Sequence, residues 1–213
     1  MLKKIIPKGI ILLLFVVFLN SCSTTQIKKN EEAFEPQVIS SDVFYEENGK
    51  SFKLKSEIFV IGEKTVRVDL RTQLDLPLAS LLMSDKKVEY VLYRDKKYFS
   101  GKPAPHVLDA LIPMDLSSED LVAVVLERPL RIQHCDYENN LLLRCRGQSG
   151  QTPYMVSWSK RTNSSPWSGK ATKMIIELPA RKISLKFYFT DRQKNPSNLT
   201  KVSTLVIPPD FHK

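Results

Sequence analysis

Residues 65–78 read Thr65-Val66-Arg67-Val68-Asp69-Leu70-Arg71-Thr72-Gln73-Leu74-Asp75-Leu76-Pro77-Leu78. The first seven alternate between apolar and polar or charged side chains, and a period of two is typical of a strand with one buried face. The residues that follow are rich in leucine, although a solvated turn is usually polar. The stretch therefore predicts an antiparallel strand followed by an unusually apolar turn.

The same alternation recurs along most of the chain. Polar turn sequences separate several of the alternating segments, at residues 47–50, 61–64 and 94–97. Successive hairpins of this kind predict a mainly β fold, an unclosed antiparallel β-barrel in the form of a strongly curved sheet. The other alternating segments are residues 52–60, 88–92, 154–158, 174–178, 183–189 and 202–206.

One part of the chain departs from the strand pattern. Residues 103–112 indicate a short helix that ends at Pro113. Leu116–Leu126 contains serines and an acidic pair before it becomes apolar, which is typical of a capped helix start. We expect these two short helices to lie as a lid over the concave side of the sheet. If they fill that side the result is a solid core, and if they cover it loosely an apolar cavity remains.

The N-terminal segment indicates export. Three lysines precede ten apolar residues at positions 10–19, a run too short for a bilayer, which needs about 20, but suited to a secretory signal. The sequence Leu19-Asn20-Ser21-Cys22 resembles the lipobox of bacterial lipoproteins, which implies cleavage before Cys22 and acylation of that cysteine. The alternative is an ordinary signal peptide that happens to end near a cysteine.

The chain divides into three predicted parts. Residues 1–21 are the lipoprotein signal peptide, residues 22–37 the lipidated N-terminus and polar tether, and residues 38–213 one folded domain. By resemblance to enterobacterial lipoproteins, Ser23 permits sorting to the outer membrane. We therefore expect a protein anchored by lipid to the outer membrane and facing the periplasm.

Composition narrows the class of partner. The 213 residues carry a net charge of +9, and removal of residues 1–21 leaves 29 basic and 23 acidic side chains, a charge of +6. This surplus favours anionic membrane surfaces or acidic partners, although a solvated basic surface without a target is an equally good explanation. Nucleic acid is not expected for an exported chain. The sequence has no glycine-rich phosphate loop and no zinc-ligand spacing, so we predict neither cofactor nor metal.

Two cysteines agree with an oxidising compartment. Cys135 and Cys145 flank a turn-rich segment, and a hairpin that turns near Asn139-Asn140 brings them almost opposite each other. We predict a disulfide between them, the alternative being two free buried cysteines.

The chain resembles the LolB family of outer-membrane lipoprotein receptors. The likeness rests on residues 65–78, on the strand pair and Tyr98 that follow, on the helical segments up to Pro129, and on residues 174–186. It implies a monomer that takes lipoproteins from the periplasmic carrier LolA into an apolar cavity beneath a helical lid, without catalysis. The chain departs from the family in its shortened first helix and in having Ala123 and Glu127 where tryptophan and glycine are usual.

The resemblance also assigns roles to residues. A leucine in the loop after an early strand inserts cargo into the membrane, and by register this residue is Leu74, with Leu76 in the same loop. Leu76 and Leu78 are more simply explained as the start of the next inward-facing strand. The predicted acyl-chain cavity is lined by Phe52, Leu54, Val66, Val68, Leu70, Tyr90, Leu92, Leu108, Leu111, Leu121 and Val125, each of which could instead be ordinary core.

Three other functions compete with the receptor. A lipid-anchored binding module for a free lipid or other small apolar ligand would need the same fold. A hydrolase using Ser164 or Ser165 with His134 lacks the Gly-x-Ser-x-Gly elbow that would support it. A structural anchor with a filled core is the last alternative.

Overall fold

In the computed structural model, residues 34–212 are described except 105–106, 109–110, 112–115, 131–133, 150–151, 163–167 and 198. The predicted signal peptide, Cys22 and most of the predicted tether lie outside the described residues. So do Ser164, Ser165 and about half of the predicted helix at 103–112.

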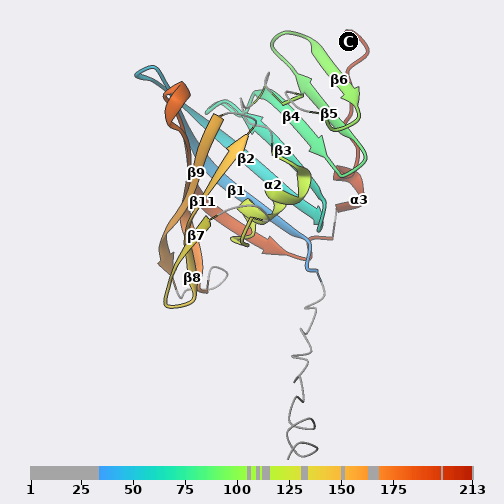
Figure 1. The fold of residues 1–213 in the computed structure, drawn as a ribbon. Coiled ribbons are helices and arrows are strands. Elements are labelled where there is room, and N and C mark those ends of the chain that lie inside the picture. The colour runs from blue at the N-terminus through green and yellow to red at the C-terminus, as the bar shows by residue number, and fades with distance from the viewer. Residues whose placement is uncertain are drawn as a thin grey trace, which may run out of the picture. The chain divides into compact units, whose positions relative to one another are not determined.

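The described residues form one antiparallel sheet of eleven strands (Figure 1). Its spatial order is β6-β5-β4-β3-β2-β1-β11-β10-β9-β8-β7, so the pairing of β1 with β11 joins the two halves of the chain. The prediction of a mainly β, strongly curved open sheet is confirmed. The strands are β1 (Gln37–Glu47), β2 (Lys50–Gly62), β3 (Thr65–Arg71), β4 (Pro77–Met83), β5 (Val88–Leu92), β6 (Lys97–Gly101), β7 (His134–Glu138), β8 (Leu141–Ser149), β9 (Thr152–Thr162), β10 (Lys170–Leu178) and β11 (Ile183–Lys194).

Register explains why the alternating sequences form a core. Ile58 lies opposite both Ile39 and Val68, and Val60 lies opposite Val66, so apolar side chains from neighbouring strands share the concave face. On the other half of the sheet Phe187 lies opposite Met174 in the same way. All of these side chains except half-buried Val68, which packs against the others, belong to a single buried hydrophobic cluster, because each strand contributes every second residue to one face.

The predicted strand at 202–206 is wrong. Leu199–Val202 forms the short helix α3, and the chain then runs without regular structure to His212. Arg67 Nη1 donates to Thr204 O at 3.1 Å, and Tyr98 N donates to His212 O at 3.0 Å. The C-terminal segment therefore covers the convex side of β3 and borders β6, where His212 forms an isolated parallel bridge with Lys97.

Only one of the two predicted lid helices is confirmed. Helix α2 (Ser118–Val125) begins at Ser117, whose hydroxyl accepts a hydrogen bond from Asp120 N at 3.0 Å, as the capping pattern predicts. In the other predicted helix, the described residues Val107, Leu108 and Leu111 lie in turns. A further single turn of 3₁₀ helix, η1 (Pro179–Arg181), connects β10 to β11. No helix within the described residues is long and apolar enough to cross a membrane.

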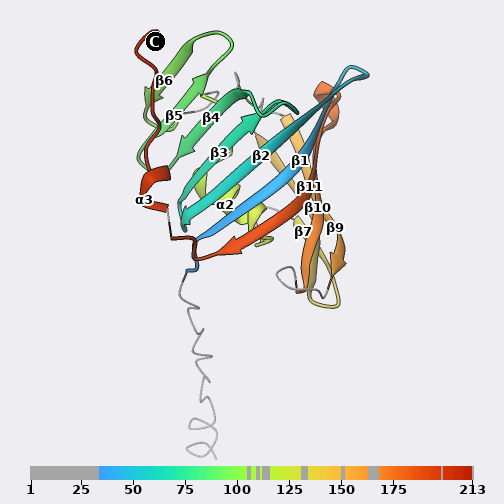
Figure 2. The ribbon, with the colours of Figure 1, turned by 180° about the vertical axis from the view of Figure 1, so that it is seen from behind.

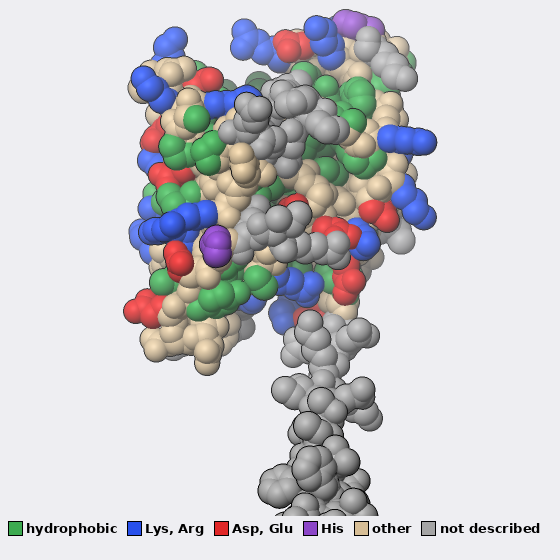
Figure 3. Space-filling view, in the orientation of Figure 1, with side chains coloured by type: hydrophobic (Ala, Val, Ile, Leu, Met, Phe, Trp, Pro, Cys, Tyr) green, Lys and Arg blue, Asp and Glu red, His purple; other side chains and the backbone are tan. Residues whose placement is uncertain are grey.

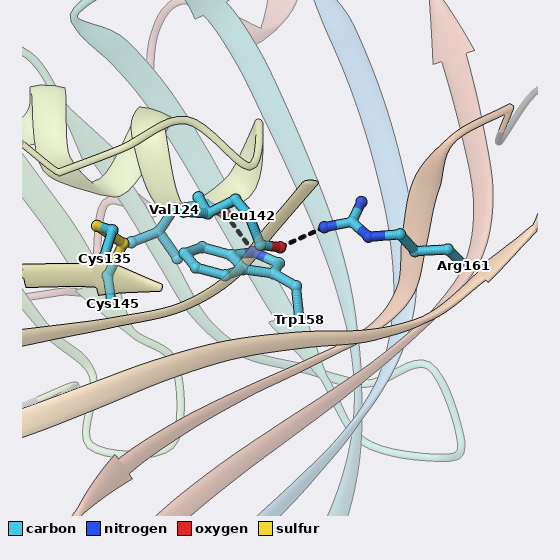
Figure 4. Close-up of a disulfide and its surroundings, with 6 residues drawn as sticks. All are labelled: Val124, Cys135, Leu142, Cys145, Trp158 and Arg161. Atoms are coloured by element: carbon cyan, nitrogen blue, oxygen red, sulfur yellow. Dashed lines mark hydrogen bonds between the residues drawn. A yellow bond between two sulfur atoms is a disulfide. The ribbon is translucent and has the colours of Figure 1, made fainter. Parts of the chain in front are cut away.

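The C-terminal end of α2 is tied to the sheet by polar contacts (Figure 4). Trp158 Nε1 donates to Val124 O at 3.1 Å, and Lys170 Nζ donates to Leu126 O at 3.4 Å. Val124 belongs to the last helical turn and Leu126 is the C-cap residue just past it, and carbonyls at a helix end lack partners within the helix. Donors from β9 and β10 therefore satisfy the helix end and hold it in place.

A buried ion pair adds to this attachment. Glu127 has a left-handed backbone (φ 57°) just past the helix, and only 3% of its side chain is exposed. Its carboxylate accepts from Arg161 Nη1 at 2.5 Å and from Ala171 N at 2.9 Å. Arg161 also donates to Gly169 O at 2.8 Å and to Leu142 O. One guanidinium thus joins the helix end to β8, β9 and β10.

The predicted disulfide is confirmed. Cys135 of β7 and Cys145 of β8 are direct register partners and are bonded to each other (Figure 4). Cys145 of β8 is fully buried in the core cluster. In β7 only Cys135 is half-buried, and the other four residues are exposed. The bond therefore fastens an edge hairpin whose own apolar contacts are few.

We expect reduction of the Cys135–Cys145 bond to lower the free energy of unfolding by about 2–3 kcal/mol, because it frees a loop of about ten residues in the unfolded chain. Urea unfolding with and without reductant measures this change. A variant with alanine at both positions is the control and should not respond to reductant. An unchanged urea midpoint for the native chain after reduction would contradict the prediction.

We expect Arg161→Met to cost about 3 kcal/mol of stability, because it leaves the Glu127 carboxylate buried without its cation. Adding Glu127→Gln to this variant should restore part of the loss, since no unpaired charge then remains. Urea unfolding of both single variants and the double variant gives the coupling energy. Additive losses would show that the two side chains do not stabilise each other.

Candidate functional site: an apolar concave face and an exposed leucine turn

The concave face brings together the strand residues predicted to line a cavity. Three rows of inward side chains cross β3, β4 and β5 in register. The rows are Val66–Met83–Val88, Val68–Leu81–Tyr90 and Leu70–Ala79–Leu92. Phe52 and Leu54 of β2 occupy the same face next to Tyr45 and Val43 of β1. The alternation read from the sequence therefore placed all seven strand residues on one face.

Four of the eleven predicted cavity residues are part of the solid core. Val66 is completely buried, and Leu108, Leu121 and Val125 are buried as well. All four belong to the main hydrophobic cluster, and helix α2 packs against β3 at this end of the sheet. For these four residues the alternative of ordinary core packing therefore applies, rather than the lining of a cavity.

The other seven residues are only partly covered. Phe52 is 53% exposed. The remaining six are half-buried: Leu54, Val68, Leu70, Tyr90, Leu92 and Leu111. Leu54 and Leu70 flank the register pair of Lys55 with Arg71, and Leu92 lies opposite Ala79, so these three leucines sit where β3 ends and β4 begins. We call the seven residues the apolar strip. Figure 3 shows hydrophobic side chains on this side of the molecule, most clearly around β4, β5 and β6.

Aromatic contacts mark both sides of the apolar strip. The rings of Tyr90 and Phe99 stack with centroids 5.3 Å apart, and those of Tyr45 and Phe52 lie 6.3 Å apart. Burial, followed by a hydrogen bond to the Glu47 side chain and that group's charge, raises the pKa of Tyr45 to about 12. Tyr45 is therefore neutral at physiological pH, and the Glu47 carboxylate beside it is the charged group at this end of the strip.

The turn between β3 and β4 exposes two leucines at the end of the strip. The side chain of Leu74 is 82% exposed and that of Leu76 is 60% exposed. The turn is ordered: Thr72 Oγ1 accepts from the backbone N–H of both leucines at 3.2 Å, and Thr72 N donates to Leu76 O at 2.9 Å. Asp75 adopts a left-handed backbone and its carboxylate pairs with Lys55 at 3.0 Å. Hydrogen bonds thus hold the leucines outward.

The simpler explanation of Leu76 and Leu78, as the start of an inward-facing strand, is wrong. The register between β3 and β4 shifts at Leu70/Arg71, so that Arg71 pairs with Pro77 and Leu70 with Ala79. Inward positions on β4 are therefore 79, 81 and 83. Leu78 lies on the convex side and Leu76 precedes the strand, so Leu76 remains in the turn with Leu74.

The sequence analysis did not predict that several basic residues gather near the end of α2. Arg192 of β11 is 97% covered on the concave side opposite Ile39, and burial lowers its pKa while the charge of Glu127 opposes that change. Burial also lowers the pKa of Lys170, and the charges of Arg192 and Arg161 act in the same direction. The strand period alone places Arg192 outward, because the inward residues of β11 from Ile183 to Phe189 are odd-numbered. The register shift between Ser40 and Ser41, which leaves Thr190 without a register partner, turns Arg192 inward.

Three cavities open elsewhere on the surface. One of about 200 Å³ is lined by serines and charged residues. These include Lys55, Arg71 and Asp75, so the cavity adjoins the leucine turn. A second, of about 190 Å³, lies beside α2, and a third, of about 480 Å³, lies near η1. Their linings are mostly polar, and none of the eleven predicted acyl-cavity residues lines any of the three. His134, the proposed hydrolase base, is exposed on the edge strand β7.

Comparison with known proteins identifies the fold. A LolA superfamily protein from Nitrosomonas europaea superposes with a TM-score of 0.54 at 9% identity, over 80% of this chain and 90% of that one. A DUF1329 family protein from Desulfovibrio piger gives a TM-score of 0.57 at 9% identity, over 81% and 91%. A domain from Vibrio parahaemolyticus, named as an outer membrane lipoprotein-sorting protein, gives 0.53 at 7% identity, over 81% and 93%.

At the sequence level no protein-family model and no curated protein matches the chain. The structural likenesses, at identities of 9% and below, establish a shared fold. The chain therefore has the open curved-sheet fold of LolA-superfamily structures, as its resemblance to the LolB family implied.

Proposed function

We propose that this protein is a lipoprotein receptor anchored by acylated Cys22 to the outer membrane. It accepts lipoproteins from a periplasmic LolA-like carrier by binding their acyl chains and inserts them into the outer membrane. The observation that carries this proposal is the ordered turn that exposes Leu74 and Leu76 at the end of the apolar strip. The fold shared with LolA-superfamily structures and the lipobox-like sequence at Cys22 support it.

Acyl chains would lie along the apolar strip rather than under α2. The helix is fixed by Trp158, Lys170 and the Glu127–Arg161 pair, so displacing it would break buried polar contacts. The half-buried strip residues, in contrast, gain burial when a hydrocarbon covers them. At about 25 cal/mol per Å² of apolar area removed from water, a few hundred Å² supplies several kcal/mol. Transfer then needs no catalytic group, only differences in affinity among carrier, receptor and bilayer.

The exposed leucines would act at the bilayer. An apolar side chain held in water gains free energy when it enters the membrane interface, about 0.8 kcal/mol for each buried methylene. Because the turn begins at Thr72, two residues after Leu70, a chain leaving the strip would meet the two leucines and the lipid at the same place. The turn therefore joins the binding surface to the membrane.

A lipid-anchored module for a free lipid or other small apolar ligand is the second candidate. It is favoured by the burial of Val66, Leu108, Leu121 and Val125, which leaves a shorter apolar surface than the full predicted cavity. Such a module would bind acyl chains but would have no use for the exposed leucines. The two functions therefore differ in the consequence of changing Leu74.

We expect Leu74→Glu to abolish delivery of lipoproteins to liposomes while leaving the fold intact, because a charge at the tip opposes entry into the bilayer. The assay mixes a LolA–lipoprotein complex with this protein and liposomes and measures cargo in the liposome fraction. Val206→Glu is the matched control, since Val206 is 81% exposed and lies far along the chain. Unchanged delivery by the Leu74 variant would favour the free-lipid module.

We expect Leu70→Gln to weaken the binding of a fluorescent fatty acid about tenfold or more, because it replaces a half-buried apolar contact of the strip with an amide. Leu78→Gln is the control, since Leu78 is also half-buried but lies on the convex side. Fluorescence titration gives both affinities, and circular dichroism checks the fold of each variant. Equal affinities would place acyl binding away from the strip.

A further inference from the structure

The convex face of the sheet carries an aromatic pair surrounded by lysines. Phe44 of β1 and Tyr188 of β11 meet edge to face with ring centroids 5.4 Å apart. The strands that bear them lie in the middle of the view in Figure 2, on the side opposite α2. We call these two rings and the following four lysines the convex patch: Lys53, Lys160, Lys173 and Lys186.

Two of the four lysines are neutralised and two are not. Lys53 pairs with Asp42 at 3.0 Å, and Lys186 pairs with Glu46 at 2.7 Å. Lys160 and Lys173 instead lie over the ring of Tyr188, 5.7 Å and 5.3 Å from its centroid. Within the described part of the chain neither of these two side chains has an ion pair. The patch therefore keeps a surplus of two positive charges beside two half-buried aromatic rings.

The patch is broad and its lysines are held on a rigid support. Lys53, Lys173 and Lys160 come from β2, β10 and β9, so the patch extends over five neighbouring strands, about 19 Å at the usual strand spacing. On the next strand, Arg144 of β8 points to the same face, because its neighbour Cys145 is buried on the other one. A partner that fits this face must present several negative charges over a comparable area.

We propose that the convex patch binds the surface of a bilayer that contains anionic phospholipid. Such a bilayer presents many phosphates in one plane, and each lysine near it gains attraction that salt screens. Tyrosine and phenylalanine suit the boundary between headgroups and hydrocarbon, and lysine stems can extend along them. This surface is separate from the leucine turn and requires neither cargo nor carrier, so its failure would leave the proposed receptor function standing.

The test uses residues 23–213, which lack Cys22 and cannot be anchored by acylation. Every described strand, helix and core side chain lies between residues 34 and 212, so this chain retains the whole described fold. Sedimentation with vesicles of phosphatidylcholine alone, or with 30% phosphatidylglycerol, measures binding at low and high salt. We expect binding only to the anionic vesicles and a loss of binding at high salt.

The decisive comparison is between two pairs of substitutions that remove the same charge. Lys160→Gln with Lys173→Gln should weaken binding to anionic vesicles by about tenfold or more. Lys86→Gln with Lys102→Gln changes two exposed lysines outside the patch and should have little effect. Lys160→Arg with Lys173→Arg should retain binding, which separates loss of charge from loss of fold.

Three results would overturn the proposal. The first is no preference of the native chain for anionic vesicles. The second is an equal loss of vesicle binding from both pairs of glutamine substitutions, which would show that binding depends on the net charge of the protein and not on the convex patch. The third is full binding by the Lys160→Gln, Lys173→Gln variant.

Discussion

An eight-residue helix cannot cover the concave face of an eleven-stranded sheet. Helix α2 is about 12 Å long, whereas eleven strands at 4.8 Å spacing extend over roughly 50 Å. Where α2 packs, at the end marked by Val66, the apolar face is completely buried. Towards the end marked by Leu70 and Leu92 it is only half-buried. Among the residues that the structure describes, α2 and the buried side chains of Leu108, Leu116 and Leu130 thus leave part of the apolar face only half-buried.

The attachment of α2 decides which part of the concave face is available. Trp158, Lys170 and Arg161 all donate to the end of the helix or to Glu127 just beyond it, and Glu127 is buried. Breaking a buried charge pair is costly, so the helix belongs to the core rather than acting as a movable lid. In the proposed receptor the acyl chains therefore use the strip between α2 and the leucine turn, and the helix serves as a fixed wall.

The two faces of the sheet have different chemistry because strand side chains alternate. Inward positions give the apolar strip, and outward positions give lysines and paired carboxylates, with Phe44 and Tyr188 among them. Both proposals use this contrast: acyl chains on one face and phosphates of a bilayer on the other. The turn that carries Leu74 lies at the strand ends, where the two faces meet, and the Lys55–Asp75 pair ties it to the convex side.

Local pattern was enough to predict most of the strands, the cap at Ser117 and the Cys135–Cys145 bond, because alternation, capping and hairpin geometry act between near neighbours. The strand predicted at 202–206 is the exception. The sequence also determined that Leu74 lies in an apolar turn. It could not determine the shift that turned Leu78 outward, the helix at Leu199–Val202 or the burial of Arg192. Those features depend on contacts between residues far apart in the chain. Which of the predicted cavity residues became core and which stayed half-exposed was decided by the place where α2 and the turn residue Leu108 pack on a wide sheet.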